Sequence, residues 1–173
     1  MKKRILRADL LFLLTSAIWG LAFVAQRVGM DYMGPLAFNF VRFGLGSLVL
    51  VPLLWRQKRK GLIPRCDRKE IILGGVLASM FLMLASTLQQ VGMVSTEAGK
   101  AGFITGLYVI LVPFLGLFLG QKVGWKTWLG AVLAVVGLYF LSVTTKFTIR
   151  RGDLYILISA VAWAFHVQTI GRF

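Results

Sequence analysis

Apolar segments with almost no charged side chains alternate with short charged stretches along the whole chain. Six such segments occupy residues 10–26, 36–55, 71–91, 98–120, 128–143 and 154–171. A helix of about 20 residues crosses the roughly 30 Å hydrocarbon layer of a bilayer, so each segment can span it, the fifth with help from its flanks. No stretch of about ten residues alternates apolar and polar positions, which argues against membrane-barrel strands. The pattern predicts an all-α membrane protein with six transmembrane helices.

The first apolar segment follows the basic stretch MKKRILR, an arrangement that a secretory signal peptide also has. The run from Leu10 to Gln26 is longer than a typical signal-peptide core, contains Trp19 and is not followed by an A-x-A cleavage site. We therefore interpret it as an uncleaved first span.

Composition and charge distribution support a membrane protein and argue against nucleic-acid binding. Apolar residues make up 58% of the 173 residues, above the value of about 45–50% for soluble domains. The net charge of +14 comes from short clusters between the apolar segments, as in the loops of polytopic membrane proteins. We expect this protein to have the lipid bilayer, and not nucleic acid, as its partner.

Six spans would place the loops alternately on the two sides of the membrane, and lysine and arginine are unequally divided between these sides. With the N-terminus inside, fourteen lie on the inner side, five on the outer side, and Arg42 within a span. The outer five are Arg27, Lys100, Lys146, Arg150 and Arg151. Because cytoplasmic loops carry the positive excess, we predict a multi-pass protein of the cytoplasmic membrane with a cytoplasmic N-terminus.

The sixth segment repeats the first. ADLLFLLTSAIWGLAFVAQ, from Ala8, aligns without a gap to GDLYILISAVAWAFHVQTI, from Gly152, and pairs Asp9 with Asp153 and Trp19 with Trp163. The offset encloses five spans, so the second copy would start on the opposite side of the membrane. Inverted repeats of this kind are found in many secondary transporters, whose substrate site lies between the repeats. We expect residues 8–145 to form the first repeat and residues 152–173 to begin a second, in a protein of about 290 residues.

The fourth segment carries small residues at every fourth position, Ala98, Gly102 and Gly106, followed by Pro113. In lipid this spacing allows two helices to come into backbone contact. A proline removes a backbone donor in mid-span and is expected to bend the helix. We predict that these four residues form a packing face and a bend, although a plain glycine-packed membrane helix fits them equally well.

Several polar or amphipathic side chains fall within spans, where contact with lipid would be costly, so we expect them to face the bundle interior. The substrate-path candidates are Trp19 and Gln26 in the first span, Arg42 in the second, Ser86, Gln89 and Gln90 in the third, Thr105 and Tyr108 in the fourth, and Trp163 and His166 in the sixth. The alternative for each is an ordinary hydrogen bond between helices, worth about 1 kcal/mol. We predict that the first, third, fourth and sixth spans line the path.

Arg42 lies about two turns inside the second span. It either extends outward toward Asp31 or Glu97 or binds an anionic group of a substrate. The position of Arg42 in the sequence is compatible with both interpretations.

The sequence lacks the combinations of residues that enzymes use for catalysis. All six acidic residues lie at span ends or in loops, and Cys66 is the single cysteine. No nucleophile–base pair, metal-ligand cluster or glycine-rich phosphate loop is present. We expect no enzymatic activity, no cofactor and no metal.

Several stretches resemble an EamA-type member of the drug/metabolite transporter superfamily. They are WGLAFVAQRVG, NFVRFGLGSLVLVPLL, STLQQVGMVSTEAGKAGFITGLYVILVPFLGLFLG and WLGAVLAVVGLYFLS, which together cover most of residues 9–145. The resemblance implies a ten-helix bundle built from two inverted five-helix repeats that exports small metabolites, amino acids or drugs. Gly120-Gln121-Lys122 departs from the pattern, since many members have Gly-Glu there.

The function expected from this resemblance is secondary transport of a small-molecule substrate by alternating access. This chain would need a missing second half to complete its cavity. A half-size transporter acting as a dimer, and a non-transporting membrane interaction protein or pore, are the alternatives. The sequence does not identify the substrate.

Overall fold

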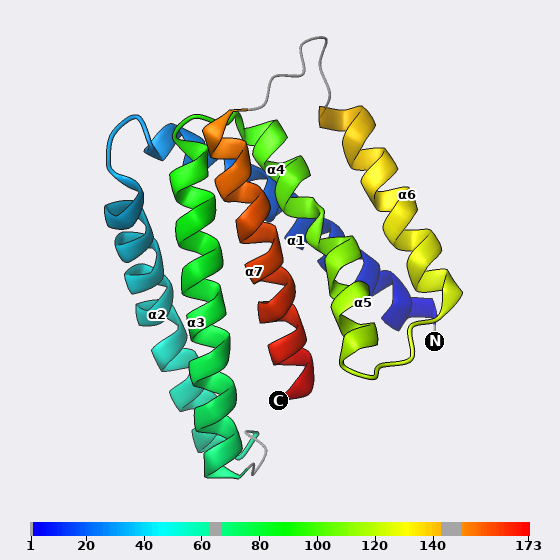
Figure 1. The fold of residues 1–173 in the computed structure, drawn as a ribbon. Coiled ribbons are helices and arrows are strands. Elements are labelled where there is room, and N and C mark those ends of the chain that lie inside the picture. The colour runs from blue at the N-terminus through cyan, green and yellow to red at the C-terminus, as the bar shows by residue number, and fades with distance from the viewer. Residues whose placement is uncertain (1, 63–66, 143–149) are drawn as a thin grey trace.

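The computed structural model describes residues 2–62, 67–142 and 150–173, and all regular structure in these ranges is helical (Figure 1). The helices are α1 (Lys2–Gly29), α2 (Pro35–Arg59), α3 (Arg68–Met93), α4 (Ala98–Gly106), α5 (Tyr108–Phe118), α6 (Trp125–Ser142) and α7 (Arg151–Arg172). Five stretches are long and apolar enough to cross a membrane: α1, α2, α3, α4 together with α5, and α7. The shorter α6 is the predicted fifth span, so the six predicted segments are all helical.

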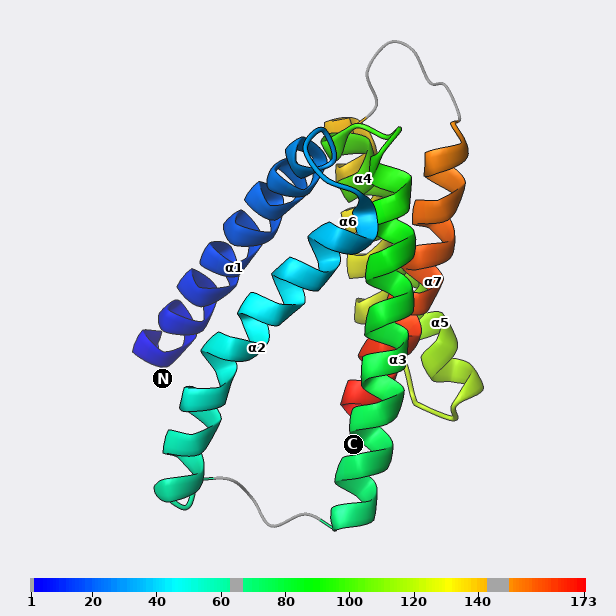
Figure 2. The same ribbon diagram turned by 90° about the vertical axis from the view of Figure 1, so that its left-hand side faces the viewer.

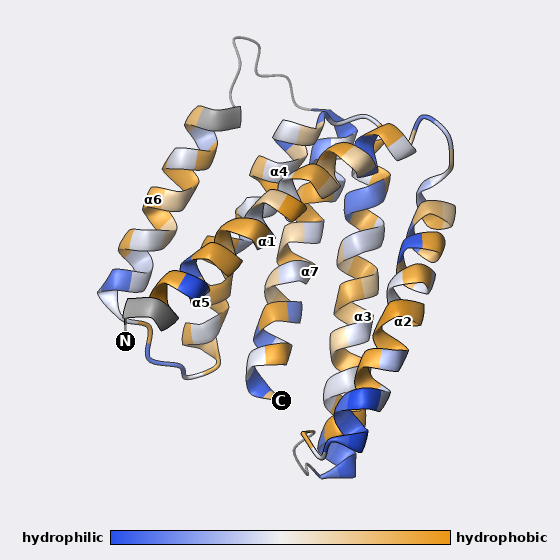
Figure 3. Cartoon of the chain, turned by 180° about the vertical axis from the view of Figure 1, so that it is seen from behind, coloured by the Kyte–Doolittle hydropathy of each residue, from blue (hydrophilic) through white to orange (hydrophobic). Residues whose placement is uncertain are grey.

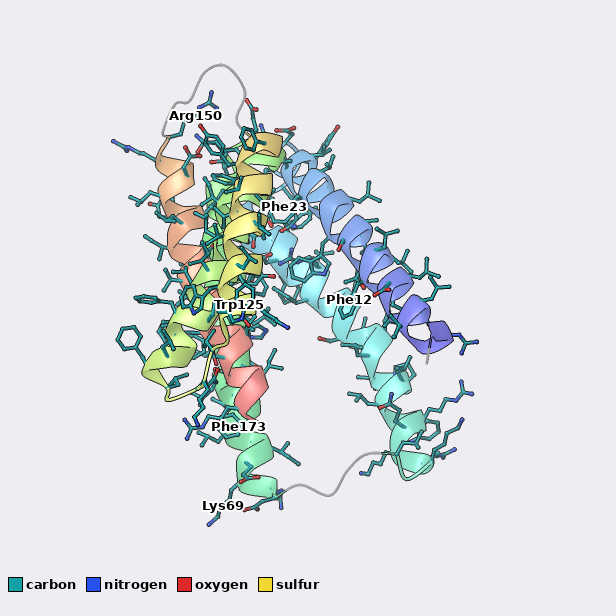
Figure 4. All side chains as sticks on the ribbon, turned by 90° about the vertical axis from the view of Figure 1, so that its right-hand side faces the viewer. Phe12, Phe23, Lys69, Trp125, Arg150 and Phe173 are labelled. Carbon is teal, nitrogen blue, oxygen red and sulfur yellow. The ribbon has the colours of Figure 1, made fainter. Side chains whose placement is uncertain are left out.

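Consecutive spans run in opposite directions across the bundle (Figures 1 and 2). The start of α7 therefore lies at the opposite end from the start of α1. Lys69 and Arg150 mark the two ends (Figure 4). α7 thus runs in the direction opposite to that of α1.

The fourth span is interrupted at Leu107, and the bend expected at Pro113 stays a prediction. Pro113 lies inside α5, and the helix assignment ends at Gly106 and resumes at Tyr108. A proline ring crowds the carbonyl four residues earlier and leaves it without its helical donor. That carbonyl belongs to Val109, which lies within α5. The interruption at Leu107 directly follows Gly106, a residue with low helix propensity.

The closest helix pair is α3 and α7, which lie side by side in Figure 1. A Cβ atom built on Gly92 of α3 would lie 2.6 Å from the backbone oxygen of Gly152 in α7. Next to this crossing, Met93, Ala101, Ile104 and Ile156 form the buried hydrophobic cluster. Two glycines therefore set the distance between α3 and α7.

The two glycines of the predicted packing face differ in their surroundings within the described residues. A Cβ on Gly106 would lie 2.6 Å from Leu138 Cδ1 of α6, whereas a Cβ on Gly102 would meet nothing within 4 Å. Ala98 is half-buried. The four-residue spacing is present, but the helix is rotated so that Gly102 faces open space.

The start of α7 is held by a carboxylate at the end of the bundle. Asp153 is 6% exposed, accepts a hydrogen bond from Thr96 Oγ1 at 2.9 Å and forms a salt bridge with Lys100. It also accepts from the Arg150 backbone N–H at 2.7 Å. The α3–α4 connection is therefore tied to α7. The Thr96 hydroxyl is thus used by Asp153, and the N-cap position of α4 is Glu97, whose side chain makes no cap hydrogen bond.

A second polar link joins α7 to α5 near the other end. Gln168 Nε2 donates to the backbone oxygen of Val112 at 2.7 Å, and Gln121 Nε2 donates to Gln168 Oε1 at 2.8 Å. Gln121 thus supplies an amide that bonds to α7.

Much of the outer surface is apolar, as Figure 3 shows for α1, α2 and α5. Large side chains such as Phe12 and Phe40 are more than 70% exposed. Water-exposed apolar area on this scale is unfavourable, so these faces suit contact with lipid. Figure 2 shows α1 and α2 leaning away from α3 toward their lower ends.

Candidate functional site

A cavity of about 230 Å³ lies where α1, α2, α3 and α7 meet. Its lining is mainly apolar and aromatic, with two amide side chains and one charged side chain. The lining residues are Ile18, Trp19, Ala22, Phe23, Gln26, Arg42, Phe43, Leu82, Gln89 and Trp163. Phe23 lies on the part of α1 that packs against the core, and Phe12 lies further toward the start of α1 (Figure 4). An apolar pocket with a few convergent polar groups is typical of a small-molecule site.

Two tryptophans form the aromatic part of the cavity. Trp19 of α1 and Trp163 of α7 pack edge to face, with ring centroids 6.1 Å apart. Trp163 Nε1 donates to Gln89 Oε1 of α3 at 2.8 Å, which fixes its indole. The two residues matched by the sequence repeat are therefore in direct contact.

Arg42 and Gln26 form the polar part. The Arg42 guanidinium donates to Gln26 Oε1 at 2.7 Å, and Gln26 Nε2 donates to the Ala22 backbone oxygen at 3.1 Å. The Gln26 amide thus turns its oxygen toward the guanidinium. Gln90 Nε2 donates to the Gln26 backbone oxygen at 3.3 Å, which ties α3 to α1 at the same level.

Arg42 does not extend outward toward Asp31 or Glu97, as one reading of the sequence predicted. Asp31 pairs with Arg27 at 2.9 Å, and the Arg42 guanidinium stays within the bundle, where it lies 4.7 Å from the Phe43 ring centroid. Arg42 reaches the neighbouring helix through Gln26, a contact that the sequence does not predict because it depends on how α1 and α2 are rotated.

The other candidates lie outside the cavity lining. Ser86 is buried and donates to Leu82 of its own helix at 2.6 Å, and His166 Nδ1 lies 2.9 Å from the Ala78 backbone oxygen. Thr105 is buried and Tyr108 half-buried. The fourth span, predicted to line the path, thus contributes nothing to this cavity, and the second span, left out of that prediction, contributes Arg42 and Phe43.

Phe23, Phe43 and Leu82 are cavity residues that the sequence does not single out. An apolar side chain in a span is equally compatible with lipid, with core packing and with a cavity wall. For Phe43, proximity to the in-span Arg42 was the only available signal. Among the described residues, no group of three His, Cys, Asp or Glu side chains is placed to hold a metal ion.

The sequence of residues 6–143 matches the model of the EamA-like transporter family. The chain belongs to the EamA-like transporter family. It is therefore a multi-pass membrane protein of a transporter family, as its motifs predicted.

Three relatives of this chain are named as transporters or as an efflux pump. An uncharacterized transporter of Archaeoglobus fulgidus is 36% identical over 169 residues, covering 97% of this chain and 50% of the relative. The uncharacterized transporter YoaV of Bacillus subtilis is 28% identical over 84% of this chain and 51% of its own length. A protein of Escherichia coli named a probable amino-acid metabolite efflux pump is 27% identical over 89% of this chain and 50% of its own length.

The chain spans about half the length of the curated relatives that it matches. No solved structure matches it. The family is therefore established from sequence, and the arrangement of the helices comes from the structure described above.

Proposed function

We propose that the chain forms one side of a secondary transporter that exports small metabolites, amino acids or drugs across the cytoplasmic membrane by alternating access. Residues 8–145 would be the first five-helix repeat and residues 152–173 the first helix of an inverted second one. Membership of the EamA-like family supports the transport role. The name of the Escherichia coli relative supports export of small metabolites.

The contact between Trp19 and Trp163 carries the proposal. Equivalent residues of two repeats can touch only close to the axis that relates the repeats. The cavity next to this contact would then lie between the halves, where inverted-repeat transporters place their substrate. Its polar groups are contributed by three helices of the first repeat and one of the second.

The remainder of the site would come from a second half or from a second copy of the chain, because the chain spans about half the length of its relatives. The exposed apolar face of α1, which includes Leu13 and Leu21, has room for such a partner. A dimer of half-size transporters and a non-transporting interaction protein are the remaining alternatives, and the following experiment separates them.

Transport is tested in proteoliposomes with the full chain alone and with the chain joined to the second half of a relative. We expect Trp163→Ala to reduce uptake of an active substrate about tenfold or more, because truncating one buried aromatic removes on the order of 2 kcal/mol of contact. Phe12→Ala, on the exposed face of α1, is the matched control and should transport normally.

The result distinguishes a dimer of half-size chains from a ten-helix protein. Transport by the chain alone supports the dimer, and transport only by the joined protein supports a ten-helix form. If neither moves any member of a metabolite panel, the protein is not a transporter and the interaction role gains support.

The proposed orientation predicts opposite accessibility at the two ends of the bundle. In a Cys66→Ser background, a membrane-impermeant thiol reagent added to intact cells should label Arg150→Cys and leave Lys58→Cys unlabelled until the cells are permeabilised. The reason is the positive excess on the proposed inner side. Labelling of both positions in intact cells would contradict the topology.

A further inference from the structure

We propose that the cavity between α1, α2, α3 and α7 binds the carboxylate of a small organic acid with an apolar body, with Arg42 as its anchor. This inference rests on the proposed transport function and names the class of substrate. It is drawn from the charge in the cavity, the unused donor on Arg42 and the aromatic wall opposite.

The charge in the cavity is not balanced by a carboxylate of the described residues. Arg42 is the only charged side chain among those that line it. The hydrogen-bond acceptor that Arg42 has, Gln26 Oε1, is neutral. An arginine roughly 10 Å from the start of α2, at 1.5 Å per residue, is costly in a membrane unless an anion or water approaches it. The site therefore favours an anionic ligand.

The Arg42 guanidinium is held in position, but not all of its N–H donors have a hydrogen-bond acceptor. Gln26 fixes one terminal nitrogen at 2.7 Å, and Nε is buried without a partner. Arginine binds carboxylates through two parallel N–H donors of its planar fork. Because the Gln26 amide is itself held by the Ala22 carbonyl, the guanidinium is held in place before a ligand arrives. Little side-chain entropy would then be lost on binding.

The remaining lining selects the body of the ligand. Trp19, Phe23 and Trp163 present aromatic surface, and Ile18 and Leu82 present aliphatic surface. Among the described lining residues no acidic side chain is present to bind an ammonium group. A volume of about 230 Å³ lies below the roughly 300–1,000 Å³ of drug-sized sites. These features favour a small aromatic or aliphatic monocarboxylate over a cation.

The test compares three probes of similar shape, phenylacetate, phenylacetamide and phenethylamine, by isothermal titration calorimetry on the purified full chain in detergent. We expect phenylacetate to bind about tenfold or more tightly than the neutral amide, since a charge-assisted hydrogen bond adds on the order of 1.5 kcal/mol. Arg42→Gln should reduce this preference to within about twofold, and Arg42→Lys should retain part of it. Arg27→Gln, which removes a surface cation paired with Asp31, is the control and should leave the preference unchanged.

Equal binding of the three probes by the wild-type chain, or binding by none, overturns the carboxylate assignment without any need for a variant. An unchanged preference in a folded Arg42→Gln protein overturns the role of Arg42. Counterflow in proteoliposomes separates this inference from the transport proposal. If a carboxylate binds but is never transported, the transport proposal is refuted and the carboxylate site stands. If neutral solutes are transported with no preference for acids, the carboxylate site is refuted and the transport proposal stands.

Discussion

Gly152→Leu is expected to separate α7 from α3 and to lower the free energy of unfolding by about 3 kcal/mol or more. A Cβ atom at this position would lie 2.6 Å from Thr96 Oγ1 and still closer to the Gly92 backbone oxygen. A backbone atom cannot move aside without shifting its helix, and overpacking costs typically 1–3 kcal/mol even where side chains can adjust. Thermal unfolding in detergent, followed by loss of the monodisperse peak in size-exclusion chromatography, measures the change.

Gly102→Leu is the matched control, because it changes a glycine to the same residue in another span. A Cβ there meets nothing within 4 Å, so stability should change by less than about 0.5 kcal/mol, as at other sites away from close contacts. Gly92→Ala should behave like Gly152→Leu to a smaller degree. The interpretation of α3 and α7 as the closest pair fails if the Gly102 and Gly152 variants unfold at the same temperature.

Asp153→Asn is expected to destabilise the attachment of α7 to the α3–α4 connection by about 2–4 kcal/mol. The carboxylate accepts hydrogen bonds from Thr96 and the Arg150 backbone and pairs with Lys100. Removing the charge weakens these three contacts, and hydrogen bonds to charged groups are each worth about 1.5–3 kcal/mol. The Lys100 side chain is 23% exposed, so solvent reduces the contribution of its contact. The unfolding temperature in detergent is the measurement.

Asp31→Asn provides the control for charge removal. Its partner is Arg27, and the Asp31 side chain is 62% exposed, so the pair is worth about 0–1 kcal/mol. Asp153→Asn with an unfolding temperature equal to that of Asp31→Asn would show that the buried carboxylate does not hold α7.

The positions of the spans and of the motifs follow from sequence because each depends on neighbouring residues. Whether a stretch such as 71–91 can cross a bilayer is decided by its length and apolar content, and α3 covers it. The pairing of Trp19 with Trp163 by the repeat was equally visible, and it identified the two aromatic residues that meet at the cavity.

The contacts between spans were decided by tertiary structure. The small-residue spacing in the fourth span predicted Gly102 as a contact, yet the close approach in that span is at Gly106. The backbones of two helices approach at Gly92 and Gly152, which belong to no such spacing. Helices in lipid associate by local fit and hydrogen bonding, without the hydrophobic force that orients helices in water. A few tens of degrees of rotation therefore decide which small residue meets a neighbour.

The sequence by itself determined a helical membrane protein of six apolar segments, its transporter family and the residue types available for a polar site. The tertiary structure decided that Arg42 turns inward to Gln26 rather than outward to Asp31, and that the second span, not the fourth, completes the cavity. Hydropathy is a sum over one segment, whereas a site is a set of distances between segments. Those distances depend on the rotation and tilt of every helix at once.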